Sequence, residues 1–329
     1  MKTDAESAAA RYAAPARPWA AAIIASRESL STVAQSIDAL AAASKQANVA
    51  LTIDLIVNGN DGLGEQAAVL VGPRGDAVRV RVWTISRGDK ANAWNEYVHR
   101  IWPGANTTFF VDGYVQVNPD ALALLDAGLG ANPECLAASG VPTQGRTATA
   151  HRNSMISGGG LHGNMHAIRQ SAMEQIRTLN FRLPVGLYRT DSLIGGAMAF
   201  RFAPAKFPWN VGLCHVAPTA SWRLINMPKG PYAILSTYFK RRLRQAQGQL
   251  ENLAVKEHMA IKLRPPQELP ACSKQMVMEW ARNNPGQVSK LVKGSPLIGY
   301  ALRRLQRSVP VSAIPSVTRE VAPSTGVSA

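Results

Sequence analysis

Over about the first 125 residues, short apolar segments alternate with amphipathic segments, and this alternation restricts the fold more than any other feature of the chain. The apolar segments have the length of strands and lie at residues 19–26, 51–61, 78–85 and 107–112. Two segments between them, 31–46 and 90–101, repeat apolar residues at helical spacing. Strands that alternate with helices predict an α/β fold, a doubly wound and mostly parallel sheet with helices on both faces.

Composition divides the whole chain into four segments. Residues 1–17 lack periodicity and are predicted to be a disordered arm, and residues 18–264 are predicted to form the α/β domain. The stretch RPPQELP, which begins at Arg264, contains three prolines and is typical of a linker. We therefore expect a linker and a basic helical extension over 265–308, followed by a disordered tail over 309–329.

The charge balance favours anionic partners. The chain has 36 lysine and arginine residues against 21 aspartate and glutamate residues, which gives a net charge of +15. Nucleotides and anionic lipid headgroups would suit that excess. Nucleic acid is the less favoured partner because the chain has no recognised nucleic-acid-binding module. Three scattered cysteines and apolar runs well below the roughly 20 residues that span a bilayer predict a cytoplasmic protein.

Polar and charged side chains follow the four predicted strands. The first strand leads to Glu28 and the second to Asn58 and Asp61. The third leads to Lys90, and the fourth ends at Asp112. Ligands of doubly wound sheets bind outside the carboxyl ends of the strands, so these groups are expected to converge on one ligand.

The order of these landmarks resembles the inverting glycosyltransferases of family 2, which have the GT-A fold. The resemblance covers roughly residues 19 to 252, and the order and spacing of its motifs carry it. The matching stretches are SRE at 26–28, VNGND at 57–61, GDKANAWNE at 88–96, VDGYVQVNPDAL at 111–122, GGLHGNMHAIRQSAM at 159–173, LPVGLYRTDSLIG at 183–195 and YFKRRLRQAQGQLE at 238–251. A GT-A-like, nucleotide-diphospho-sugar transferase type of fold is thereby implied for this chain.

The resemblance implies transfer of a sugar from a nucleotide-diphosphate donor to a hydroxyl acceptor, with inversion at the anomeric carbon. Asp191 is the candidate general base, and a helix N-cap is its alternative role. A divalent metal, Mg or Mn, would bridge the donor phosphates from Asp112. The candidate donor-binding residues are Glu28, Asn58, Asp61, Lys90, Asn95, Asp112, Arg241 and Arg244.

Two positions depart from the family pattern. The second acid of the metal segment falls at Tyr114, and the first acid of the acidic pair is replaced by Thr190. Tyrosine is a weak ligand for a hard cation, so the metal would rest on Asp112, phosphate oxygens, water and His215. An alternative is therefore a catalytically degenerate GT-A domain that binds a nucleotide or a partner as an accessory protein.

The basic C-terminal region suggests a location for the reaction. The stretch ALRRLQR places Leu302 and Leu305 beside arginines, which suits the surface of an anionic bilayer. Packing of this helix on the catalytic domain is the alternative. If the helix binds the bilayer, a lipid-linked acceptor at the inner face of the membrane would fit. The resemblance implies envelope or exopolysaccharide synthesis.

Overall fold

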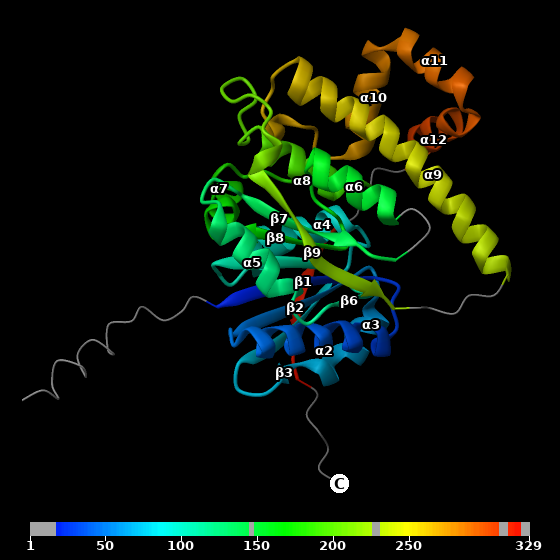
Figure 1. The fold of residues 1–329 in the computed structure, drawn as a ribbon. Helices are drawn as coiled ribbons and strands as arrows, with labels where there is room; N and C mark the ends of the chain where they lie inside the picture. Colours follow the sequence, from blue (N-terminus) through cyan, green and yellow to red (C-terminus); the bar gives the residue numbers. More distant parts are fainter. Residues whose placement is uncertain (1–17, 145–147, 226–230, 309–314, 324–329) are drawn as a thin grey trace, which may run out of the picture.

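The computed structural model describes residues 18–144, 148–225, 231–308 and 315–323, with only the backbone for 231–237. The arm predicted at 1–17 lies outside these ranges. Within them, one sheet forms with the strand order β10-β4-β2-β1-β5-β8-β7-β9-β6, and β3 pairs with β4 (Figure 1). The strands are β1 Trp19–Ala25, β2 Leu51–Asn58, β3 Gly72–Pro73, β4 Val78–Ile85, β5 Thr107–Asp112, β6 Val115–Val117, β7 Ala137–Pro142, β8 Met165–Arg169, β9 Cys214–Leu224 and β10 Thr318–Val321.

The predicted mostly parallel α/β sheet is confirmed. Strands β4, β2, β1 and β5 run parallel, in the order that right-handed strand–helix–strand crossovers produce. Beyond β5 the sheet becomes mixed, because β8 pairs antiparallel with both β5 and β7. Further along, β9 runs parallel to β7, and the short β6 pairs antiparallel with β9.

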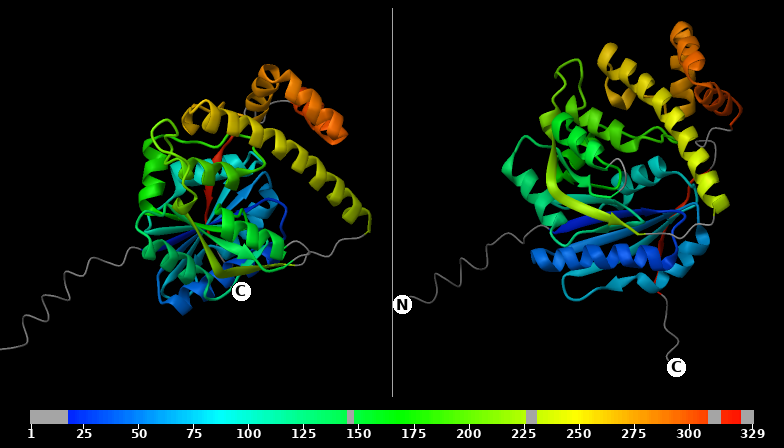
Figure 2. Two further views of the ribbon diagram at one scale, coloured as in Figure 1. Left: turned by 45° about the horizontal axis from the view of Figure 1, so that its top comes forward. Right: turned by 45° about the vertical axis from the view of Figure 1, so that its right-hand side comes forward.

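Helices cover both faces of the sheet, as Figures 1 and 2 show. Ala21 and Ile23 of β1 point into one core, and Ala22 and Ile24 point into the other, because successive strand residues face opposite sides. The first core contains α2, α3 and α5, and the second contains α4, α7, α8, α9, α10 and α12. The helices are α2 Leu30–Ala47, α3 Asp61–Gln66, α4 Lys90–Glu96, α5 Ala121–Ala131, α6 Ala148–Gly158, α7 Gln170–Thr178, α8 Thr190–Ala199, α9 Pro231–Lys256, α10 Ser273–Asn283, α11 Pro285–Gly294 and α12 Pro296–Arg307.

The C-terminal extension is helical, and α12 packs against α9. Ile298, Ala301 and Leu305 of α12 are buried, while Leu302 is half-buried. The apolar face of this helix is therefore used inside the protein, which is the alternative that the sequence had left open. No helix among the described residues is both long enough and apolar enough to span a bilayer.

The prediction of disorder over 309–329 is wrong for residues 318–321. These four residues form β10, which pairs antiparallel with the edge strand β4, from Thr318 opposite Ile85 to Val321 opposite Val82. The neighbouring Val317 also exchanges hydrogen bonds with Ser86. Edge strands have unpaired backbone groups that another strand can satisfy, and a local sequence pattern does not reveal that pairing.

Glycines let the carboxyl ends of neighbouring strands approach each other closely. Gly59, after β2, has a φ of +64°, and an added Cβ would lie 2.4 Å from Cα of Gly88, after β4. Gly113, after β5, leaves no room for a Cβ, which would lie 2.9 Å from Cβ of Ala25 in β1. The turns after β2 and β4, and those after β1 and β5, are thus packed backbone to backbone.

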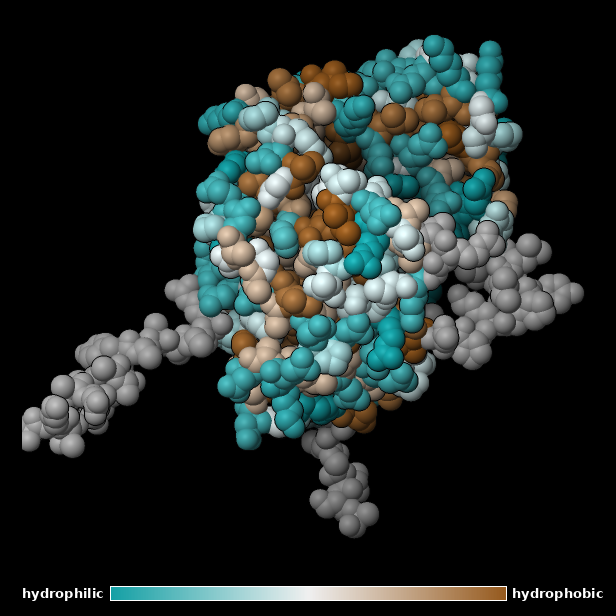
Figure 3. All heavy atoms as spheres, viewed as in Figure 1, coloured by the Kyte–Doolittle hydropathy of each residue, from teal (hydrophilic) through white to brown (hydrophobic). Residues whose placement is uncertain are grey.

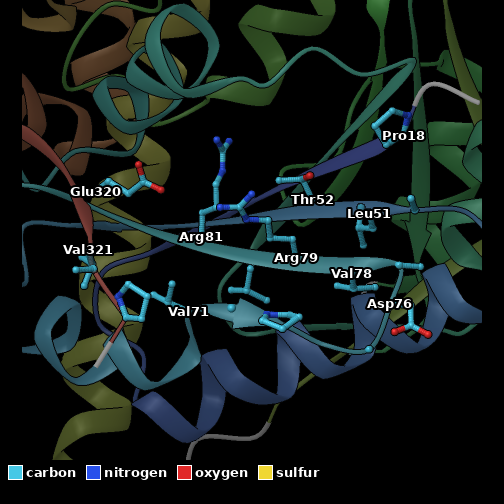
Figure 4. A pocket seen from close by; sticks show the side chains of 18 residues that line it. Pro18, Leu51, Thr52, Val71, Asp76, Val78, Arg79, Arg81, Glu320 and Val321 are labelled. Atoms are coloured by element: carbon cyan, nitrogen blue, oxygen red, sulfur yellow. The ribbon is translucent and has the colours of Figure 1, made fainter. Parts of the chain in front are cut away.

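A cavity of 880 Å³ lies beside β4 and β10, at the end of these strands opposite to the glycine turns. Figure 4 shows Arg79, Arg81 and Glu320 among the residues that line it. It includes Leu51 and Val78, the first residues of β2 and β4, so it lies at the amino ends of these strands.

Candidate active site

Asp112 is the last residue of β5, between β1 and β8. It is buried, and its backbone N–H donates to the carbonyl of Asn164 at 3.2 Å. Its Oδ1 accepts from Nζ of Lys90 at 2.5 Å, and its Oδ2 accepts from the hydroxyl of Tyr114 at 2.9 Å. Both carboxylate oxygens therefore have partners on this chain.

Lys90 begins α4, and its place is fixed by Asp89, which caps the helix by accepting from the N–H of Asn92 at 2.7 Å. Burial opposes charge on the Lys90 ammonium. The carboxylate of Asp112 outweighs that effect, with contributions from Asp191 and Glu28, and raises the pKa of Lys90 above its usual value. The ammonium is therefore charged throughout the neutral range.

Asp191 lies in the first turn of α8, which begins at Thr190 and has Arg189 at the N-cap. Asp191 is therefore not the N-cap residue of α8, which was the alternative role that the sequence allowed, and Arg189 at that position makes no side-chain capping hydrogen bond. An added Cβ on Gly163 would lie 3.5 Å from Oδ2 of Asp191 and 3.7 Å from Nζ of Lys90. The structure thus brings Asp191 and Lys90 together at Gly163, and Asp112 joins them through its ion pair with Lys90.

Two acids hold the segment that leads into α8. Asp89 accepts from the N–H of Gly186 at 3.0 Å, in addition to capping α4. Glu251 of α9 accepts from the N–H of Tyr188 at 3.0 Å and from Gln247 at 2.8 Å. Glu251 is 1% exposed, and burial raises its pKa although these hydrogen bonds lower it. Sequence reasoning missed both acids, and Glu251 is a rare acid in an otherwise basic stretch of helix.

Further polar and aromatic groups lie around Asp112, and sequence reasoning missed three of them, Asn164, Trp222 and His162. In the amide orientation that satisfies both of its atoms, Asn164 donates to Oδ2 of Asp112 at 3.3 Å and accepts from Nε1 of Trp222 at 3.2 Å. The ring of His162 lies 4.8 Å from that of Trp222. Burial lowers the pKa of His162 to about 4, so its imidazole is neutral at pH 7. Burial also raises the pKa of Tyr114, more than the charge of Asp112 does, so the phenol keeps its proton.

The first two strand ends lie side by side. Glu28 accepts from the N–H groups of Ser26 and Arg27 at 2.7 and 2.8 Å and so closes the turn after β1. Asn58 donates to the carbonyl of Ala25 at 2.8 Å. Asp61 is exposed in the first turn of α3. The charge of Glu28 is one of the smaller contributions that raise the pKa of Lys90.

Asn95 does not face this group, which corrects its assignment as a donor-binding residue. Its amide nitrogen donates to the carbonyl of Leu183 at 2.9 Å, and its amide oxygen accepts from the N–H of the same residue at 2.8 Å. The side chain is buried, with both polar atoms used. Asn95 therefore joins α4 to the segment before α8.

His215 lies far from Asp112, which corrects its assignment as a metal ligand. It pairs with Ala138 of β7, so β9 is three strand spacings, roughly 14 Å, from β5. Its ring packs on α5, where an added Cβ on Gly128 would lie 2.6 Å from Cδ2 of His215.

The side chains around Asp112 do not fit a divalent metal centre. Mg and Mn prefer several oxygen ligands, and here one carboxylate is shared between an ammonium and a phenol. Among the described residues, no group of three or more histidine, cysteine, aspartate or glutamate side chains could hold a metal ion.

Arg241 and Arg244 are exposed on α9. The contacts of the described residues do not join either arginine to Asp112, Lys90 or Asp191. Their assignment to the donor phosphates therefore stays a prediction.

A cavity of 250 Å³ adjoins Asp191. It lies between α6 and α8 and is lined by His151, Trp209 and the glycines at 158–160. Trp209 is 55% exposed, and its ring packs edge-on against that of Phe200 at 5.1 Å.

No family model matches the chain, and no curated protein matches it. Among solved structures, the mannosyltransferase PcManGT from Pyrobaculum calidifontis, in complex with GDP-Man and Mn²⁺, is similar to it with a TM-score of 0.52 and 17% identity, over 90% of this chain and 78% of that one. A structure of S. aureus TarS 1-349 with UDP-GlcNAc has a TM-score of 0.48 and 12% identity, over 90% and 83%. The chain has a GT-A-type glycosyltransferase fold, as its sequence motifs implied.

Proposed function

We propose that this chain is an inverting glycosyltransferase that moves a sugar from a nucleotide-diphosphate donor to a hydroxyl acceptor. The observation that carries the proposal is the meeting of Asp191 and Lys90 at Gly163, with Asp112 paired to Lys90. A carboxylate and a cation at one place are what this reaction needs: a base for the acceptor and positive charge for the leaving diphosphate. The GT-A-type fold supports the choice of donor class.

In this proposal Asp191 accepts the proton of the acceptor hydroxyl. The hydroxyl oxygen forms a bond to the anomeric carbon while the bond from that carbon to the diphosphate breaks, and its electron pair leaves with the diphosphate. Attack from the face opposite the leaving group inverts the anomeric centre. Asp89 and Glu251 act as positioning residues because they bind the backbone immediately before α8.

The proposed acceptor is lipid-linked, and the proposed setting is envelope or exopolysaccharide synthesis at the inner face of a membrane. Exposed aromatic and basic side chains on α9 and α12 support this choice, because such residues suit the headgroup region of an anionic bilayer. They include Tyr238, Phe239, Tyr300, Arg303 and Arg304. The rings of Phe239 and Tyr300 lie 6.5 Å apart. Figure 3 shows hydrophobic and hydrophilic residues interspersed over this extension at the upper right.

The test is turnover of UDP-, GDP- and dTDP-sugars, measured as release of nucleoside diphosphate. We expect one donor to be consumed by the wild type and the Asp191→Asn variant to be roughly 10²- to 10⁴-fold slower, which is the usual contribution of a general base. Asp38→Asn, at an exposed position of α2, is the matched control and should keep full activity. Equal rates for the Asp191→Asn variant and the wild type would exclude Asp191 as the base.

A second candidate function is a nucleotide-binding accessory protein without catalysis. It is favoured by Tyr114 and Thr190, which stand where the family has acids. Binding of a nucleoside diphosphate with no consumption of any sugar nucleotide, in the presence of candidate acceptors, would select this function.

A further inference from the structure

The side chains that bind Asp112 include a cation, the ammonium of Lys90. The Lys90 ammonium lies 2.5 Å from Oδ1 of Asp112, and the Tyr114 hydroxyl lies 2.9 Å from Oδ2. Asp112 is held by β5, Lys90 by the capped start of α4 and Tyr114 by the turn before β6, so rigid elements place all three groups. A metal ion at Asp112 would have to displace Lys90 or Tyr114. It would then have only one carboxylate as a protein ligand.

Tyr114 adds to this mismatch. It stands two residues after Asp112, where a second carboxylate would complete an Asp-x-Asp pair. A protonated phenol donates a hydrogen bond to Asp112 and competes with a cation for the same oxygen. The pair of acids is thereby replaced by an acid and a hydrogen-bond donor.

Lys90 has donor capacity beyond Asp112. An ammonium has three N–H groups, of which one donates to Asp112 and a second donates to the carbonyl oxygen of Gly163, which lies 3.4 Å from Nζ. The Lys90 side chain is 38% exposed, whereas that of Asp112 is 12% exposed. The remaining N–H can therefore reach a phosphate oxygen from the solvent side, while Asp112 keeps the ammonium in place.

We propose that Lys90 takes the place of a divalent metal in this chain, so that its site binds the diphosphate of a nucleotide without a metal ion. This inference rests on the proposed function, because it assigns the diphosphate of the same donor to the Lys90–Asp112 pair. It also reverses the expectation of Mg or Mn that the sequence motifs had implied.

Calorimetry with the full-length protein tests the proposal, using UDP, GDP and dTDP in EDTA and then with MnCl₂ or MgCl₂. We expect one nucleoside diphosphate to bind, with affinities in EDTA and in Mn²⁺ that agree within about threefold. Lys90→Met should weaken binding at least tenfold, as expected for loss of a charge-assisted hydrogen bond. Lys293→Met, an exposed lysine of α11, is the matched control and should bind as the wild type does.

A second variant keeps the test decisive if Lys90→Met is poorly folded. Tyr114→Asp restores two acids, and we expect this variant, unlike the wild type, to bind Mn²⁺ alone, as measured by electron paramagnetic resonance of the free ion. An increase of tenfold or more in wild-type affinity on adding Mn²⁺, or Mn²⁺ binding by the wild type, would overturn the proposal while leaving the proposed function intact. Failure of all three nucleotides to bind under every condition would overturn both.

Discussion

The candidate active site and the region beside β4 and β10 each have an aspartate paired with a basic side chain, but only Arg81 of the second pair lines the cavity there, and the two pairs differ in which donor groups they leave for a ligand. At the cavity, Arg81 donates to Asp54 through two nitrogens at 2.7 and 3.0 Å, and Trp83 donates to the same carboxylate at 2.9 Å. Asp54 is fully buried. At the candidate site, the Lys90 side chain is 38% exposed.

We interpret the Asp54–Arg81 pair as a structural ion pair and the Asp112–Lys90 pair as the proposed binding one. The cavity at β4 has a volume of 880 Å³ and the one beside Asp191 has 250 Å³, so volume alone would select the opposite end of the strands from the proposed site. The Arg81 guanidinium that faces the larger cavity is fixed to Asp54 by two parallel hydrogen bonds and also donates to the carbonyl of Ile101. Lys90, in contrast, keeps an N–H for a ligand.

The largest expected effect is on stability, from removal of the structural pair. Asp54→Ala would leave the Arg81 guanidinium largely buried without its carboxylate, and we expect a loss of about 3–5 kcal/mol in the free energy of unfolding. Urea unfolding followed by circular dichroism measures it. Binding of the nucleoside diphosphate by the folded fraction should be unchanged.

Asp54→Asn is the companion variant, since it keeps the shape of the side chain and removes its charge. A loss of nucleotide affinity in either variant, at native circular dichroism, would show that the two regions are coupled and would break the comparison.

A smaller effect is expected at Glu251, which positions the segment before α8. Glu251→Gln replaces an acceptor oxygen by an NH₂ group. We expect this variant to have a free energy of unfolding about 1 kcal/mol lower than the wild type below pH 4.5. Burial raises the pKa of Glu251 in the folded state, so the wild type loses stability as the pH rises through that pKa, whereas the variant does not.

The difference in stability between Glu251→Gln and the wild type should therefore narrow between pH 4 and pH 7.5. Urea unfolding at both values measures it. A difference that widens with pH would mean that the ionised carboxylate stabilises the fold, contrary to this expectation.

The smallest stability effect is expected at Lys90. The Lys90 side chain is 38% exposed, and Asp112 keeps its hydrogen bond from Tyr114 after the change, so Lys90→Met should cost less than about 1 kcal/mol in the free energy of unfolding while it weakens nucleotide binding strongly. The pKa of Lys90 is raised above 10.5, so its contribution is present throughout the neutral range and is lost only at higher pH. Thermal unfolding from pH 6 to pH 9 checks this, and a large or pH-dependent loss in that range would make Lys90 a structural residue like Arg81.

The sequence predicted the half of the fold that local patterns encode. Strands β1, β2, β4 and β5 follow from apolar segments between helical ones, and their shared direction follows from the crossovers. The pairings of β8, β9 and β10 could not be predicted, because no local pattern in these segments shows which strand each one pairs with or in which direction. β10 is the extreme case, since it pairs with β4 more than 230 residues earlier.

The candidate site shows the same division. Asp112 and Lys90 could be named because strand ends in a parallel sheet converge, and the structure brings them together. Asn95 and His215 could not be placed correctly, because the direction of a side chain depends on its packing partners, which are Leu183 and Gly128. Glu251 was missed because burial, which gives it a role, is a property of the folded chain.

The most direct test is the location of a bound nucleoside diphosphate. A crystal structure of the protein with UDP, GDP or dTDP, whichever binds, grown in the presence of EDTA, would show it. We predict a β-phosphate oxygen within hydrogen-bonding distance of Nζ of Lys90, with the terminal phosphate directed toward Asp191. A diphosphate bound in the cavity beside β4 and β10, with Lys90 still paired only to Asp112, would contradict the proposed site.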